Sequence, residues 1–277
     1  MVIRYREALA YIKDALKDIS DEVDSEAKII ISHLTKIEPN RLIISEPSVD
    51  TDSIDPIINE RKNGRPLQYI IGHWWFYGLE FLVGEGVLIP RQDTEILVET
   101  VIGIAQNKKA DKIADLCSGS GCIAVSLGKN LPNAKVTAVE KYPEAARFLK
   151  KNITLNGAKN VEAVMSDVCE SPFGNYDIIV SNPPYIPDGD RVILSKEVLK
   201  EPESALFGGQ DGLFFYRVIA KKWKTVLNPN GVMAFEVGIK EAEAVADILK
   251  AEGFTDIGFG KDLLGIQRVV FGTVNNI

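Results

Sequence analysis

Strand and helix patterns alternate along the chain from Lys112 to its C-terminal end. Short apolar runs rich in β-branched residues predict five strands, at 112–117, 135–140, 160–165, 176–181 and 231–237. Helical periodicity predicts helices at 120–130, 143–156, 211–227 and 239–251, and two late strands are expected near 253–259 and 267–272. Strands that alternate with helices are joined by crossover connections. The pattern therefore favours an α/β fold with a seven-stranded, mostly parallel sheet and helices on both faces.

Residues 1–72 have a helical pattern instead. One predicted helix carries Ala8, Ile12 and Leu16 on a single face, and a second runs from about Val23 to Leu34. Shorter helices are expected around 40–45, 51–61 and 66–71. We interpret residues 1–73 as a small N-terminal helical bundle that docks a substrate.

Aromatic residues and glycine turns in residues 74–89 predict a β-hairpin. We interpret residues 74–92 as a linker to the main domain, which then spans 93–277. An extra strand of the main sheet is an alternative for the same residues. Asp93 or Thr94 is expected to cap a helix that continues to about Ala105.

Composition excludes several classes of protein. The 277 residues carry a formal net charge of −7, and residues 1–75 hold 10 Lys/Arg against 13 Asp/Glu. A protein that binds nucleic acid through a general basic surface is therefore not expected. Charged residues precede any apolar run at the N-terminus, and no stretch reaches the length of a membrane span, so we expect a cytoplasmic protein. Cys117, Cys122 and Cys169 form no metal-ligand pattern, and no metal is expected.

A stiff polar loop follows the predicted strand at 176–181. The apolar run stops at Asn182-Pro183-Pro184-Tyr185. Two prolines cannot donate to a sheet ladder, and each restricts the residue before it to extended geometry. Asn182 thus lies at the carboxyl end of a strand, where open α/β sheets bind their ligands. A turn that merely ends the strand is the alternative interpretation.

The groups of this loop suit a planar NH₂ substrate. The Asn182 amide oxygen and the Pro183 carbonyl can accept its two N–H groups, while the Tyr185 ring packs on its plane. Such a nitrogen is a weak nucleophile, because its lone pair is delocalised. Acceptors that favour the pyramidal nitrogen act mainly in the transition state. We therefore predict that Asn182, Pro183 and Tyr185 are catalytic and that Pro184 joins them in binding substrate.

A second candidate site lies at the ends of the earlier strands. The strand at 112–117 runs into the small-residue turn Cys117-Ser118-Gly119-Ser120-Gly121, which lets backbone approach a ligand closely. Glu140 ends the next strand, where a carboxylate can accept both hydroxyls of a ribose. Asp115 would repel a pyrophosphate but suits an amino group, and the third glycine of a dinucleotide fingerprint is absent. A nucleoside joined to an amino acid fits these charges, which describes S-adenosylmethionine.

The chain resembles the peptide chain release factor glutamine methyltransferases over nearly its whole length. The matching motifs are Leu88-Ile89-Pro90-Arg91-x-Asp93-Thr94-Glu95, Asp115 to Gly121, Ser181-Asn182-Pro183-Pro184-Tyr185-Ile186, and Glu201-Pro202-x-x-Ala205-Leu206-x-Gly208-Gly209-x-Asp211-Gly212. The resemblance departs at Gln92, which replaces a proline, at Val168, which replaces an aromatic residue, and at Glu241, which replaces a glutamine.

The resemblance implies a class I, Rossmann-like methyltransferase that converts S-adenosylmethionine to S-adenosylhomocysteine. Its substrate would be the glutamine of the Gly-Gly-Gln motif in bacterial class I release factors. By position, residues 117–121 would wrap the methionine part, Glu140 would bind the ribose, and Asp167-Val168 would lie beside the adenine. Asn182 would contact both cofactor and substrate.

Two other activities would use the same loop chemistry. A nucleic-acid amino-methyltransferase would need a basic recognition surface or an inserted target-recognition domain, and the acidic N-terminal domain and the short loops argue against this activity. The sister family that methylates a glutamine in a large-subunit ribosomal protein is not separated by the residues alone. A binding protein that has lost catalysis is disfavoured, since Asn182 and Tyr185 are present.

Overall fold

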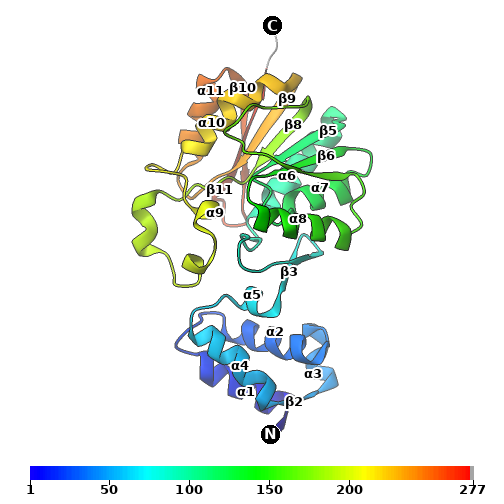
Figure 1. The fold of residues 1–277 in the computed structure, drawn as a ribbon, viewed down its shortest axis with the longest axis vertical. Helices are drawn as coiled ribbons and strands as arrows, with labels where there is room; N and C mark the ends of the chain where they lie inside the picture. The colour runs from blue at the N-terminus through cyan, green and yellow to red at the C-terminus, as the bar shows by residue number, and fades with distance from the viewer. Residues whose placement is uncertain (275–277) are drawn as a thin grey trace. The chain divides into compact units, whose positions relative to one another are not determined.

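The computed structural model describes residues 1–274, which divide into two compact units (Figure 1). Residues 1–72 form the first unit together with Ser195–Lys200. The second unit comprises His73–Leu194 and the chain from Glu201 onwards. No helix within residues 1–274 is both long and apolar enough to cross a membrane.

The first unit is a helical bundle with a short two-stranded sheet. Its elements are β1 (Val2–Arg4), α1 (Tyr5–Leu16), α2 (Val23–Thr35), η1 (Pro39–Arg41), α3 (Leu42–Ser45), β2 (Ser48–Asp50), α4 (Thr51–Lys62) and α5 (Leu67–Ile71). The predicted helices are present, whereas the pairing of β1 with β2 was not expected. Three-residue strands are too short to show an alternating pattern.

A buried arginine joins the segment Ser195–Lys200 to the rest of this unit. Arg61 of α4 is 1% exposed and donates to Glu26 of α2, at 3.0 and 2.7 Å, and to Glu197, at 2.8 Å. A buried guanidinium needs such partners, since an unpaired buried charge is very costly. The ion pair therefore accounts for the grouping of Ser195–Lys200 with residues 1–72.

The second unit is built on a seven-stranded sheet of order β10-β11-β9-β8-β5-β6-β7. The strands are β5 (Lys112–Leu116), β6 (Lys135–Glu140), β7 (Val161–Met165), β8 (Tyr176–Ser181), β9 (Leu227–Glu236), β10 (Phe254–Lys261) and β11 (Gln267–Val274). The pairs from β9 through β7 are parallel, and β11 runs antiparallel to both of its neighbours. The predicted mostly parallel sheet is confirmed.

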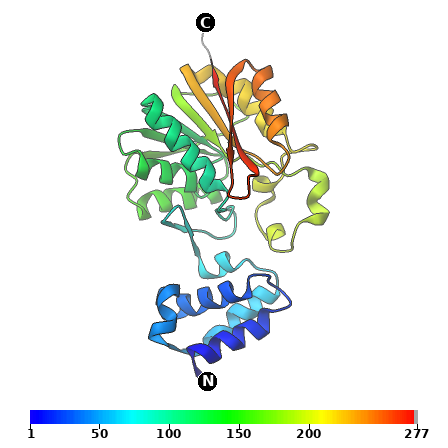
Figure 2. The ribbon, with the colours of Figure 1, turned by 180° about the vertical axis from the view of Figure 1, so that it is seen from behind.

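Helices cover both faces of this sheet, as the two opposite views show (Figures 1 and 2). The helices of this unit are α6 (Thr94–Lys108), α7 (Cys122–Asn130), α8 (Pro143–Leu155), α9 (Glu203–Leu206), α10 (Phe214–Trp223) and α11 (Ala242–Ala251), with η2 (Asp188–Ile193) and η4 (Lys224–Val226). The short helix η3 (Val198–Lys200) belongs to the first unit. Ile113 and Ile178 pack with α6 and α7, while their strand neighbours Ala114 and Ile179 pack with α10 and α11. Successive strand residues point to opposite faces of the sheet, so a strand that is apolar throughout contributes to the hydrophobic cores on both faces.

The hairpin of β3 (His73–Phe76) and β4 (Leu79–Leu82) forms its own two-stranded sheet. The alternative of an extra strand in the main sheet is therefore excluded. The hairpin belongs to the second unit and is bonded to α8, where Asn152 accepts from Leu82 N at 2.7 Å and donates to Leu82 O at 3.0 Å.

Candidate active site

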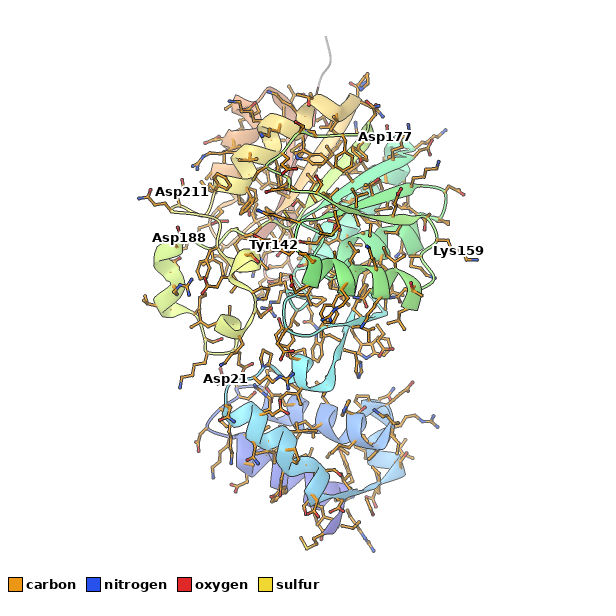
Figure 3. All side chains as sticks on the ribbon, in the orientation of Figure 1. Asp21, Tyr142, Lys159, Asp177, Asp188 and Asp211 are labelled. Atoms are coloured by element: carbon orange, nitrogen blue, oxygen red, sulfur yellow. The ribbon has the colours of Figure 1, made fainter. Side chains whose placement is uncertain are left out.

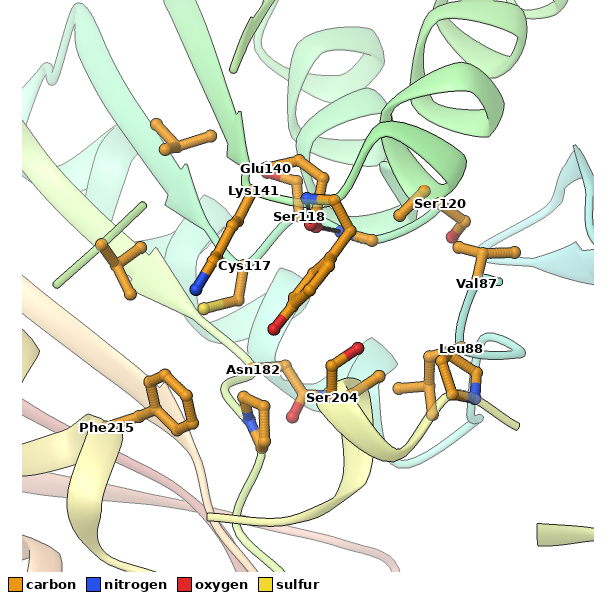
Figure 4. Close-up of a pocket in the computed structure, with 18 of the residues that line it drawn as sticks. Val87, Leu88, Cys117, Ser118, Ser120, Glu140, Lys141, Asn182, Ser204 and Phe215 are labelled. Atoms are coloured by element: carbon orange, nitrogen blue, oxygen red, sulfur yellow. Dashed lines mark hydrogen bonds between the residues drawn. The ribbon is translucent and has the colours of Figure 1, made fainter. Parts of the chain in front are cut away.

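A cavity of about 340 Å³ lies at the carboxyl ends of β5, β6 and β8. In Figure 3, the labelled Tyr142, just after β6, lies beside this carboxyl edge of the sheet. The labelled Asp177, at the start of β8, lies at the opposite edge. Figure 4 shows Cys117, Ser118 and Glu140 on one side of the cavity and Asn182 and Ser204 on the other. The predicted site residues that line it are Cys117, Ser118, Gly119, Ser120, Glu140, Asp167, Val168, Asn182 and Pro184. Four predicted site residues, Asp115, Gly121, Pro183 and Tyr185, are not among the lining residues.

The turn after β5 has a left-handed backbone. Cys117 has a φ of 59°, which is unusual for a residue with a side chain, and Gly121 has a φ of 82°. A Cβ on Gly121 would lie 2.4 Å from Leu149 Cδ1 of α8, so the turn packs tightly on that helix. This geometry keeps the backbone of the turn at the cavity wall. Burial raises the pKa of Cys117, and that of Cys122 to about 12, so both stay thiols rather than reactive thiolates.

Glu140 holds two segments of the cavity wall. One carboxylate oxygen accepts from Gly119 N and the other from Tyr142 N, each at 2.8 Å. A carboxylate has about four acceptor positions, so each oxygen keeps one for a ligand hydroxyl. The side chain is largely buried yet lines the cavity. This arrangement fits a vicinal diol such as that of a ribose.

Asp115 lies behind the turn and not at the cavity surface. It is fully buried, and its Oδ2 accepts from Ala124 N of α7 at 3.2 Å. Its Oδ1 is buried without a hydrogen-bond partner among the described residues. Burial raises the pKa of Asp115 to about 7, against the hydrogen bond from Ala124 N. The structure thus gives Asp115 a role in holding the start of α7, and direct contact with a ligand stays a prediction.

Asp167 and Val168 follow β7 at another wall of the cavity. Asp167 accepts from Cys169 N at 2.8 Å and pairs with Lys141 Nζ at 2.9 Å. Burial opposes ionisation, but these hydrogen bonds outweigh it and lower the pKa of Asp167. The Val168 carbonyl accepts from the indole of Trp223 at 3.0 Å, which fixes the backbone there. A charged acceptor beside an apolar surface suits the amino group and ring of a purine.

Asn182 is anchored by its nitrogen. Its Nδ2 donates to Thr94 Oγ1 at 3.3 Å, and no described residue donates to its Oδ1. The Pro183 carbonyl likewise accepts no hydrogen bond from residues 1–274. Both acceptors that the sequence predicted are thus available to a ligand.

Tyr185 packs away from the cavity. Its Cδ2 lies 3.2 Å from where a Cβ on Gly238 would be, and the ring joins the core formed with α10 and α11. Burial and the nearby Glu236 raise the pKa of its hydroxyl above the usual value. The next residue, Ile186, bridges to Phe207 and accepts from Gly208 N at 2.9 Å, which fixes the loop. Packing of the ring on a substrate stays a prediction.

Two segments outside the strand ends also line the cavity, and sequence reasoning gave them no role. The first comprises Gly86, Val87, Leu88, Pro90, Arg91 and Thr94, and the second Pro202, Ser204 and Ala205; Phe214 and Phe215 at the start of α10 line the cavity as well. Glu201, which is 4% exposed, accepts from Ile89 N at 2.9 Å and pairs with Arg91, so it ties the two segments together. The Pro90-Arg91 and Glu201-Pro202 motifs mark both segments in the sequence. Their spacing along the chain does not show that the two segments lie side by side in the fold.

Comparison with known families gives two matches. The methyltransferase small domain matches residues 92–224, and the PrmC N-terminal domain matches residues 7–72. Among solved structures, a methyltransferase from Pyrococcus furiosus is 18% identical with a TM-score of 0.53, covering 72% of this chain and 91% of that chain. The hMettl16 catalytic domain in complex with the MAT2A 3′UTR hairpin 6 is 17% identical with a TM-score of 0.56, covering 72% and 77%. These likenesses show the class I methyltransferase fold.

Curated relatives match almost the entire chain. The release factor glutamine methyltransferase of Thermodesulfovibrio yellowstonii is 38% identical over 271 residues, covering 95% of this chain and 96% of that relative. That of Clostridium acetobutylicum is 38% identical over 278 residues, covering 97% and 98%, and that of Aquifex aeolicus is 34% identical, covering 94% of each. The chain belongs to the release factor glutamine methyltransferase family.

Proposed function

We propose that the protein transfers a methyl group from S-adenosylmethionine to the side-chain amide nitrogen of the glutamine in the Gly-Gly-Gln motif of bacterial class I release factors. The observation that carries the proposal is the unused acceptor pair, Asn182 Oδ1 and the Pro183 carbonyl, after β8 beside a cavity that Glu140 lines. Membership of the family names the substrate class.

The cavity residues fit S-adenosylmethionine. Glu140 offers two acceptors to the ribose, and Asp167 with Val168 offers a polar edge and an apolar face to the adenine. The backbone of the turn 117–121 can approach the methionine part of the cofactor closely. The sulfonium of the bound cofactor supplies an electrophilic methyl group. Conversion to S-adenosylhomocysteine follows from that chemistry.

Asn182 and Pro183 would act on the substrate amide. Their oxygens accept its two N–H groups, which holds the nitrogen in place and favours its pyramidal form as the lone pair leaves conjugation. Because Thr94 fixes the Asn182 carboxamide, this acceptor is preorganised and gains strength as positive charge develops on the nitrogen. The alkylated amide is strongly acidic, so no strong base is needed to remove its proton.

The first structural unit is proposed to dock the release factor. It matches the PrmC N-terminal domain over residues 7–72, whereas the methyltransferase small domain matches residues 92–224. Its excess of acidic over basic residues suits a protein partner more than a nucleic acid.

Incubation with methyl-labelled S-adenosylmethionine and three separate acceptors tests the function. Purified release factor should take up label on the Gly-Gly-Gln glutamine, while ribosomes and DNA should not. A release factor with that glutamine changed to alanine is the matched control. Label on a large-subunit ribosomal protein or on DNA, with none on release factor, would overturn the proposal.

A further inference from the structure

The loop that carries the two candidate acceptors is fixed where it leaves the sheet. Ser181, the last residue of β8, is fully buried, and its hydroxyl donates to Leu116 O of β5 at 2.7 Å. The two prolines that follow Asn182 have fixed φ angles, and each restricts the residue before it. Pro183 and Pro184 therefore form a stiff unit, and a displacement at its far end is carried back to Asn182.

The far end of this loop pairs with a second piece of chain, residues 206–212, here called the glycine segment. Ile186 forms a parallel bridge with Phe207. Backbone hydrogen bonds join the two pieces, from Ile186 N to Leu206 O at 2.9 Å, from Gly208 N to Ile186 O at 2.9 Å, and from Asp188 N to Gly209 O at 3.0 Å. The loop is thus held at both ends, with the unused acceptors between them.

Two buried glycines of the glycine segment lie so close to the loop that no side chain fits. Gly208 has no positive φ, so space alone requires glycine there. A Cβ on Gly208 would lie 2.6 Å from Pro184 O, which is closer than such atoms approach, and it would also overlap the Gly212 carbonyl. Gly212 in turn lies against the Tyr185 carbonyl. Moving either neighbour of Gly208 would therefore press on the loop.

We propose that Gly208 is a positioning residue, which sets the place of Asn182 Oδ1 and the Pro183 carbonyl by letting the glycine segment pack directly on the loop. Gly212 does the same at the next carbonyl of the loop. The inference rests on the proposed function, in which these two oxygens accept the substrate N–H groups. Acceptors of this kind stabilise a transition state only when they are held within about 0.5 Å of their productive positions.

Gly208→Ala tests the close approach, and Gly189→Ala is the matched control. Gly189 lies in η2 just after the loop, has no positive φ, and a Cβ there would meet nothing within 4 Å. In Gly208→Ala, the single-turnover rate with saturating release factor and S-adenosylmethionine should fall at least about tenfold, because a misplacement of 1 Å can cost about 10²-fold. Its affinity for S-adenosylhomocysteine, measured by calorimetry, should be nearly unchanged, since Glu140 and the turn 117–121 are untouched. Gly189→Ala should match the wild type in both measurements.

Two further measurements need no methyl transfer. The side-chain amide resonances of Asn182, assigned by their loss in Asn182→Asp, should shift in Gly208→Ala and stay in place in Gly189→Ala. In the wild type, the backbone amides of Ile186 and Gly208 should be protected from hydrogen exchange, because both donate within the paired segments. The exchange measurement tests the pairing even if Gly208→Ala does not fold.

Wild-type rates in a folded Gly208→Ala protein, unmoved Asn182 resonances, or unprotected Ile186 and Gly208 amides would each overturn the inference. So would a loss of cofactor affinity as large as the loss of rate, because that result indicates a general structural role. If the resonances shift and the amides are protected, but the wild-type protein methylates no release factor, the proposed function fails instead.

Discussion

Asn182 is the residue on which the proposed chemistry depends most. Asn182→Ala removes the oxygen that would accept one substrate N–H, and the loss of one preorganised transition-state hydrogen bond costs on the order of 10²–10³ in rate. We expect turnover to fall by that amount while S-adenosylmethionine affinity changes little. Single-turnover rates with a release factor, together with calorimetry of the cofactor, check this. Asn182→Asp keeps an acceptor and should retain part of the activity, whereas normal chemistry in Asn182→Ala would refute the mechanism.

Glu140 should matter for affinity rather than for chemistry. Glu140→Ala removes the acceptors for a ribose, and hydrogen bonds to a charged group contribute about 1.5–3 kcal/mol each. It also frees Gly119 N and Tyr142 N, which the carboxylate holds at 2.8 Å. Calorimetry should show S-adenosylmethionine binding weakened at least about tenfold, which corresponds to 1.4 kcal/mol. Unchanged affinity in a folded Glu140→Ala protein would remove Glu140 from the cofactor site.

At the scale of elements, α8 joins the hairpin to the cavity wall through Asn152. This side chain is fully buried and bonds to both Leu82 backbone groups and, at 2.9 Å, to Ser120 O in the turn after β5. Asn152→Ala leaves these groups unsatisfied, and each costs about 1–3 kcal/mol. Urea unfolding should show a loss of about 3 kcal/mol, and cofactor binding should weaken because the turn loosens.

Asn156, the residue that caps the C-terminal end of α8, provides the control for Asn152. It donates to Glu80 O of the hairpin at 2.9 Å but does not reach the turn. Asn156→Ala should lower stability less and leave S-adenosylmethionine affinity intact. Equal effects of the two substitutions on cofactor affinity would show that the bond to Ser120 is unimportant.

Elements with a clear period were predictable from the sequence, and those defined by a few long-range bonds were not. The strands β5, β6 and β8 were expected within a residue of their observed ends, since buried β-branched runs end abruptly at polar or glycine residues. The same reasoning placed Asn182, Glu140 and the turn 117–121 at one edge of the sheet. It could not find Thr94 or Glu201, because their roles come from partners that lie 88 and 112 residues away in the chain. Nor could it show that Tyr185 packs into the core instead of lining the cavity.

At the scale of the molecule, the two units should separate binding of cofactor from recognition of the protein substrate. Among the described residues 1–274, those that line the cavity all belong to the second unit. A chain of residues 73–277 should therefore bind S-adenosylmethionine with near wild-type affinity, measured by calorimetry. It should methylate a short Gly-Gly-Gln peptide at the rate of the full-length protein, because the peptide offers no surface for docking. On intact release factor its kcat/KM should fall at least about tenfold, as expected when a docking contact contributes 1.4 kcal/mol or more. If both chains methylate intact release factor equally fast, the docking role assigned to the first unit is wrong.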